Sequence, residues 1–61
     1  MDRNTAQQLI AQGYVAIVYV AYAYADKQQG DVISKHKTYE AANRKASGSS
    51  MWGVRFLGDI A

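Results

Sequence analysis

The sequence predicts a small α+β domain, with helices and strands in the order α-β-β-α-β. Two observations carry this prediction. A run of twelve uncharged residues, 14–25, holds eight β-branched or aromatic residues and four alanines, a composition typical of a strand. Two polar segments, 4–13 and 38–48, begin with capping residues and end at glycine, which is typical of helices. With 61 residues the chain is predicted to be one domain, residues 1–61, close to the size below which folding needs help, so self-association is expected.

The first helix is predicted over residues 4–13. Asn4 or Thr5 is the expected N-cap, and Gly13 is the expected stop. The apolar stripe of this helix consists of Ala6, Leu9 and Ile10. It is short and only weakly apolar, so we expect it to cover a limited area of the sheet.

Residues 14–25 are interpreted as the central strand. A membrane-spanning helix needs about 20 apolar residues, so this run is too short to cross a bilayer. Every position is apolar or Tyr, so periodicity cannot separate a buried helix from a buried strand, and composition decides for the strand. A strand apolar on both faces belongs in the middle of a sheet.

Two further strands and a second helix follow. Residues 31–37 predict a strand joined to the first by a loop at 25–30, and Lys35 and Lys37 are typical of an exposed edge. Residues 38–48 predict a helix with Thr38 as N-cap, and its charges suit the helix dipole. Its expected inward stripe is Tyr39, Ala42 and Ala46. Residues 51–57 alternate in the manner of a half-buried strand.

A right-handed crossover through residues 38–48 is simplest if the third strand lies beside the first. The prediction is therefore a three-stranded, mostly antiparallel sheet of order 2-1-3, packed with one or two short helices. We expect the second helix to cover the face bearing Trp52, Val54 and Phe56. On the central strand, the residues assigned to this covered face are Val15, Ile17, Tyr19, Ala21, Ala23 and Ala25.

The opposite face is the predicted functional surface. Its tyrosines and valines exceed what the first helix can cover, and uncovered apolar patches commonly mark binding sites. The predicted partner-binding residues are Tyr14, Val18, Val20, Tyr22, Tyr24 and Arg55, with Met51 and Leu57 beside them. The alternative is that both helices cover the sheet and the tyrosines are ordinary core. The leading hypothesis is a non-catalytic protein-binding chain, a homodimer or an inhibitor or adaptor of a larger partner.

A single-stranded nucleic acid is the alternative partner. Tyrosines on an exposed sheet can stack on bases, and basic residues are concentrated in the second half of the chain. The residues in question are Lys35, Lys37, Arg44, Lys45 and Arg55. The net charge of only +2, without a run of basic residues, favours the reading that these charges simply solvate the surface.

No catalytic or metal-binding pattern is found. His36 is the only histidine, there is no cysteine, and the pair Ser34 and His36 has no acid to orient it. Asp26 and Asp31 fit a turn better than a calcium loop. The serines at 47, 49 and 50 follow a helix C-terminus, where the dipole disfavours phosphate. We expect no enzyme activity, cofactor, metal, small-molecule substrate or membrane contact, and a complete, cytoplasmic chain.

Overall fold

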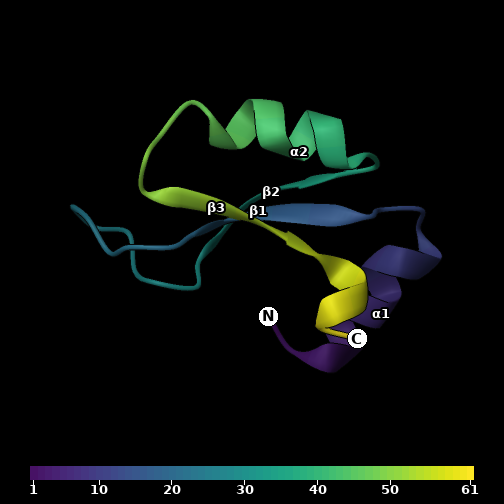
Figure 1. Cartoon of the computed structure of the whole chain (residues 1–61). Coiled ribbons are helices and arrows are strands. Elements are labelled where there is room, and N and C mark those ends of the chain that lie inside the picture. Colours follow the sequence, from purple (N-terminus) through teal and green to yellow (C-terminus); the bar gives the residue numbers. More distant parts are fainter.

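The computed structural model describes residues 1–61 and contains three strands, two α-helices and a 3-10 helix (Figure 1). The elements are α1 (Arg3–Ala11), β1 (Ala16–Val20), β2 (Val32–His36), α2 (Tyr39–Ala46), β3 (Trp52–Phe56) and η1 (Leu57–Asp59). None of the helices is both long and apolar enough to cross a membrane. The predicted α+β class is confirmed.

The sheet has the predicted order, β2-β1-β3, and both pairings are antiparallel. Val18 marks the middle of the sheet, where it lies between Ser34 of β2 and Val54 of β3. The register of β1 and β2 shifts after Val18, and Ile33 is the extra residue on β2. A bulge of this kind twists the strand locally and interrupts its pairing.

Each face of the sheet has its own small core. α2 lies along one face, whereas α1 and η1 lie against one end of the other (Figure 1). The α2-side cluster contains Ala16, Val18 and Ala42, packed against Ile33, Ala46, Trp52 and Val54. The α1-side cluster contains Ala6, Ile17 and Leu57, packed against Leu9, Tyr14, Tyr19 and Ile60. We call the sheet face opposite α2 the open face, because α1 and η1 cover only part of it.

The predicted face of β1 is wrong by one residue. α2 packs on Ala16 and Val18 and not on the odd-numbered residues, although Trp52 and Val54 do face α2 as expected. The helix approaches closely where Ala42 meets Ala16, since neither side chain extends beyond a methyl group. Ile17 consequently points to the other face, where it packs with Ala6 and Leu57.

The predicted central strand is also too long. β1 ends at Val20, opposite Trp52, and the chain then leaves the sheet. Tyr24 and Lys27 exchange two main-chain hydrogen bonds of 3.1 and 2.7 Å, which closes a tight turn with Ala25 at a φ of 48°. The length of β1 is therefore set by the strands that pair with it and not by its amino-acid composition.

The helix ends show how local sequence places the elements. Thr38 caps α2 as predicted, its hydroxyl accepting from the Ala41 N–H at 3.1 Å. α1 begins earlier than predicted, because its cap is Asp2, whose carboxylate accepts from the Thr5 N–H at 2.8 Å. Gly13 ends α1 as predicted. With a φ of 96° it allows the two main-chain bonds of a Schellman motif, from Tyr14 to Leu9 and from Gly13 to Ile10.

Candidate protein-binding surface

The six predicted partner-binding residues do not form one surface. Val18 and Val20 are fully buried, Val18 in the cluster beneath α2, so neither is available to a partner. Arg55 lies on the opposite face of the sheet, across from Ile17, and it is exposed. The prediction placed the three on one face because it assigned the wrong parity to β1.

Tyr14 and Tyr24 are held by contacts within the chain. The ring of Tyr14 packs on the α1-side cluster, and the ammonium groups of Lys35 and Lys37 lie 4.9 and 5.6 Å from its centroid. The hydroxyl of Tyr24 accepts a hydrogen bond of 2.9 Å from the Trp52 indole N–H. Both tyrosines therefore contribute to the fold, and both are half-buried.

Tyr22 is different, because 67% of its surface is exposed. The main chain holds it beside β3, since the N–H groups of Ala21 and Tyr22 both donate to the Met51 carbonyl. Met51 is itself 38% exposed. Of the three predicted partner-binding tyrosines, Tyr22 is the one whose ring lies in solvent.

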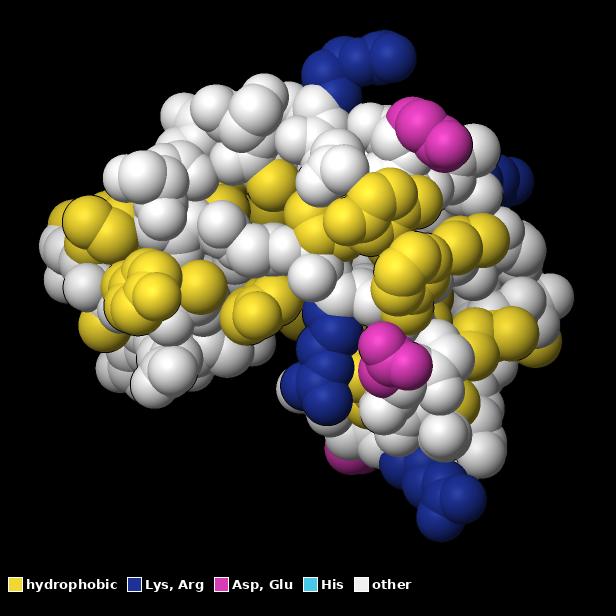
Figure 2. All heavy atoms as spheres, in the orientation of Figure 1, with side chains coloured by type: hydrophobic (Ala, Val, Ile, Leu, Met, Phe, Trp, Pro, Cys, Tyr) yellow, Lys and Arg dark blue, Asp and Glu magenta, His cyan; other side chains and the backbone are white.

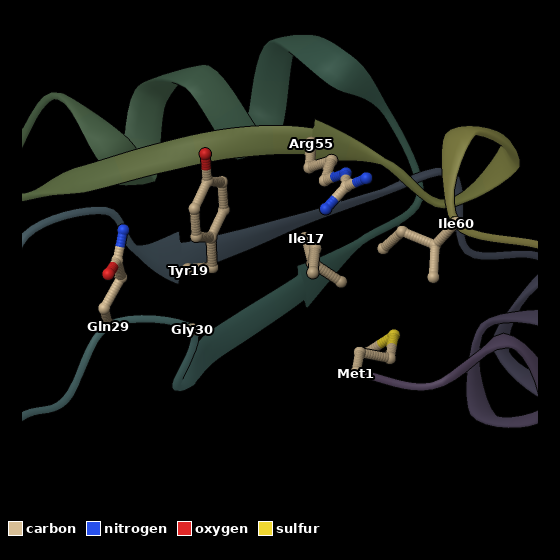
Figure 3. A pocket seen from close by; sticks show the side chains of 7 residues that line it. All are labelled: Met1, Ile17, Tyr19, Gln29, Gly30, Arg55 and Ile60. Atoms are coloured by element: carbon tan, nitrogen blue, oxygen red, sulfur yellow. The ribbon is translucent and has the colours of Figure 1, made fainter.

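The open face carries a hollow that Arg55 borders. Ile17 has Lys35 opposite it on β2 and Arg55 opposite it on β3, so the three form a row across the sheet. In the next row the Tyr19 ring lies over Gly53, where an added Cβ would come within 3.1 Å of it. The hollow has a volume of about 230 Å³ and is lined by Ile17 and Arg55, with the Tyr19 ring at its border, where it extends over β3 (Figure 3). Its other lining residues are Met1, Gln29, Gly30 and Ile60.

The outer edge of β3 is unpaired main chain. Leu57 donates to Val15 and Met51 accepts from Ala21, so the odd-numbered residues of this segment bond to β1. In an antiparallel ladder the intervening residues point their N–H and C=O groups the other way. On β3 these residues are Trp52, Val54 and Phe56. β3 is the last strand on its side of the sheet, so these groups face outward.

Exposed apolar side chains gather beside this edge. Phe56 is 44% exposed and stacks on Tyr39 of α2 with ring centroids 4.8 Å apart and planes 14° apart. Figure 2 views the molecule from the side on which β3 lies, and it shows a band of hydrophobic side chains broken by one basic side chain. We call this the β3-edge surface, formed by the outer edge of β3 with Tyr22, Tyr39, Met51 and Phe56. These are four of the eight large hydrophobic residues that are exposed.

The residues of the β3-edge surface were only partly predicted. Tyr22 is exposed, as the prediction requires. Tyr39 and Phe56 lie on the α2 side of the sheet as predicted, but they stack on each other at its border and stay 39% and 44% exposed. Gly53 carried a usable signal, since a lone glycine within a strand pattern often marks a close approach by another group. Here that group is the ring of Tyr19.

The predicted nucleic-acid residues lie on two sides of the molecule. Lys35 and Arg55 share the open face, whereas Arg44 and Lys45 belong to α2, on the other side of the sheet. The Lys45 ammonium lies 5.8 Å from the Trp52 ring centroid. A single strand following one face could therefore use only part of the predicted set.

Ser34 and the single histidine, His36, lie side by side on the sheet. The Ser34 hydroxyl and the His36 Nε2 are 2.7 Å apart on the α2 face, as their spacing on a strand predicts. No group of three or more His, Cys, Asp or Glu side chains is placed to hold a metal ion. Hydrogen bonding to Thr5 lowers the pKa of the capping Asp2 carboxyl below its ordinary value.

The fold and surfaces define a small α+β domain with a partly uncovered sheet and an exposed strand edge. Comparisons of this chain with protein-family models, with curated proteins and with solved structures found no match.

Proposed function

We propose that this chain is a non-catalytic binding protein that acts through a protein–protein interface, and that the interface is the β3-edge surface. One observation carries the proposal: unpaired main-chain groups and exposed aromatic side chains occur together along the same strand. Main-chain groups of an edge strand give affinity to an added strand, and neighbouring side chains give specificity.

The side chains on this surface are suited to the role. Aromatic residues and Met are enriched at protein interfaces, where their large rigid or adaptable surfaces are buried at modest entropic cost. Phe56 and Tyr39 are already stacked on each other, so part of the ordering cost of binding has been met by folding. Tyr22 and Met51 extend the surface at the other end of β3.

Two matched variants test this proposal. Phe56 and Ile10 are 44% and 42% exposed, and they lie on β3 and α1 respectively. We expect Phe56→Ser to weaken the association of the chain, with itself or with a captured partner, by about tenfold or more. Ile10→Ser should leave association unchanged. The measurements are sedimentation equilibrium and affinity capture with crosslinking from cells that make the protein, and equal effects of the two variants would refute the assignment.

A second candidate function, binding of single-stranded nucleic acid, is favoured by the open face. The row of Lys35, Ile17 and Arg55 places two cations on this face, Arg55 one row from Tyr19 and the Lys35 ammonium 4.9 Å from the Tyr14 ring centroid. Aromatic rings with nearby cations suit stacked bases with flanking phosphates. It predicts binding to labelled oligonucleotides that weakens steeply with salt.

Two double variants that remove the same charge distinguish binding of nucleic acid at the open face from non-specific electrostatic attraction to the whole chain. Replacing Lys35 and Arg55 by Gln should abolish binding to the oligonucleotide. Replacing Arg44 and Lys45 by Gln, on the α2 side, should reduce it only slightly. If the unmodified chain binds no oligonucleotide at low salt, this function is excluded.

A further inference from the structure

We infer that β3 pairs antiparallel with β3 of a second copy of this chain, with a two-fold axis at Val54, to form a continuous six-stranded sheet. The inference rests on the proposed function, since it names the partner of the β3-edge surface. The product is a closed, symmetric dimer in which the same strand is used by both copies.

The two edges of the sheet differ in how they are protected. On β2, Lys35 and the adjacent Lys37 are charges of the kind that discourages pairing with another chain. β3 contains neither Lys nor Pro, and its single charge, Arg55, points into the hollow of the open face (Figure 3). β3 is therefore the edge that is available for pairing.

The position of the axis follows from the outward main-chain groups. Val54 is the middle residue of β3, so an axis there pairs the strand along its whole length. The N–H of Val54 in each copy would donate to the Val54 carbonyl of the other, and the N–H of Phe56 to the Trp52 carbonyl. The Trp52 N–H is already used within the chain, where it donates to the Ser49 carbonyl at 3.3 Å.

The side chains match in this register. Phe56 lies opposite Trp52 of the second copy on the α2 face, which is a favourable aromatic cross-strand pair. Arg55 lies opposite Gly53 of the second copy on the open face, where the Tyr19 ring occupies the space that a side chain would take. The Tyr19 ring covers Gly53, so the guanidinium would meet the ring of the second copy, a cation–π arrangement.

Alternative registers are less favourable. Moving the axis to Arg55 places two like charges directly opposite each other, which is destabilising. Moving it to Gly53 pairs two residues that have no side chain and leaves Phe56 without a cross-strand neighbour in the paired strand. The Val54 axis pairs every residue of β3 and keeps the two Arg55 side chains apart.

A second copy also suits the size of the chain. Only seven of its 61 residues are buried, divided between the two faces of the sheet. A standard interface buries about 800 Å² per partner, which would be a fifth of the 4046 Å² surface of this chain. Strand pairing with the flanking aromatic rings uses less than that, so we expect a reversible, concentration-dependent dimer.

Chemical synthesis of the full chain allows a test by single N-methylation. A methyl group on the Val54 nitrogen removes an outward N–H and blocks pairing, while the side chain and the bonds to β1 are retained. The matched control carries the methyl group on Lys35, which lies on the outer edge of β2. Sedimentation equilibrium measures association, and circular dichroism with Trp52 fluorescence confirms that each chain is folded.

We expect the unmodified chain and the Lys35-methylated chain to dimerise, and the Val54-methylated chain to remain monomeric. Should the latter fail to fold, disulfide trapping gives an independent test, since the chain has no cysteine of its own. Val54→Cys should form a covalent dimer under mild oxidation, because paired Cα atoms about 5.5 Å apart fit a disulfide. Lys35→Cys should not.

A dimer that survives Val54 methylation, or crosslinking through Lys35→Cys but not Val54→Cys, would overturn the inference. So would a wild-type chain that sediments as a monomer at every concentration. The proposed function is judged separately by comparing Phe56→Ser with Ile10→Ser, because capture of another protein by the β3-edge surface does not require β3 to pair with itself.

Discussion

Replacing Leu57 by alanine tests whether the half-covered open face depends on a single side chain. Leu57 is fully buried, and it joins Ala6 of α1 to Ile17 of β1. It also begins η1, the element that brings Ile60 against the same cluster. Loss of its side chain therefore leaves a cavity between α1 and the sheet.

The expected cost is large for a chain of this size. Leu→Ala removes three carbon groups, at about 0.8 kcal/mol each, which gives about 2.4 kcal/mol before any cavity is counted. With the cavity, measured Leu→Ala changes reach about 3–5 kcal/mol. A 61-residue domain has a total of about 3–9 kcal/mol, from about 0.05–0.15 kcal/mol per residue. We expect Leu57→Ala to remove between a third and all of the stability.

Urea unfolding followed by the fluorescence of Trp52, the only tryptophan, measures this change. Leu9→Ala is the matched control, because Leu9 packs on the same cluster but is only partly buried. It should cost less than half as much. If the two variants cost the same, or if Leu57→Ala costs under about 1 kcal/mol, the description of this cluster is wrong.

Tyr24→Phe should cost about 1 kcal/mol in urea unfolding and shift the Trp52 emission, because the indole N–H loses its acceptor; an unchanged spectrum would argue against this bond. Ala25→Gly should raise the free energy of unfolding by about 0.5–1 kcal/mol, because the steric strain of alanine at a positive φ is larger than the backbone entropy that glycine loses on folding; a lower urea midpoint would contradict the turn geometry. The Asp2 cap should stabilise α1 above pH 3.8 and lose this effect as pH falls through the lowered pKa of the folded chain. Melting temperatures from pH 6 to 2 should therefore fall more for the natural chain than for Asp2→Asn, and parallel curves would exclude the cap as the cause.

Features set by nearby residues were predicted well. Thr38 and Gly48 bracket α2 correctly because a cap acts on the N–H groups of the same turn. Gly13 ends α1 for an equally local reason. The N-cap of α1 was harder to predict, because Asp2, Asn4 and Thr5 are three possible capping residues within four positions. The carboxylate of Asp2 reaches the Thr5 N–H, so the helix starts before both predicted caps.

Features set by distant residues were not predictable in the same way. Every position of residues 14–25 is apolar or Tyr, so nothing within the run distinguishes its two faces or marks its end. The end is fixed at Val20 by Trp52, which is far away in the sequence. The covered face is fixed by Ala42, which needs Ala16 beneath it. The η1 helix depends likewise on packing of Leu57 against α1, and it was missed.

The five tyrosines show why the candidate surface moves from a face of the sheet to its edge. Four have a defined contact in the fold: Tyr14 with two lysines, Tyr19 over Gly53, Tyr24 with Trp52, and Tyr39 on Phe56. Tyr22 is 67% exposed and is held beside Met51, next to β3. Most of the tyrosines in this sequence therefore serve the fold, because they cover the border of a very small core. The apolar surface that remains lies along β3, the strand whose outer main-chain groups are also unpaired. Because exposed apolar side chains and unpaired main-chain groups occur together there, pairing of β3 with another strand is favoured over binding of a ligand on the open face.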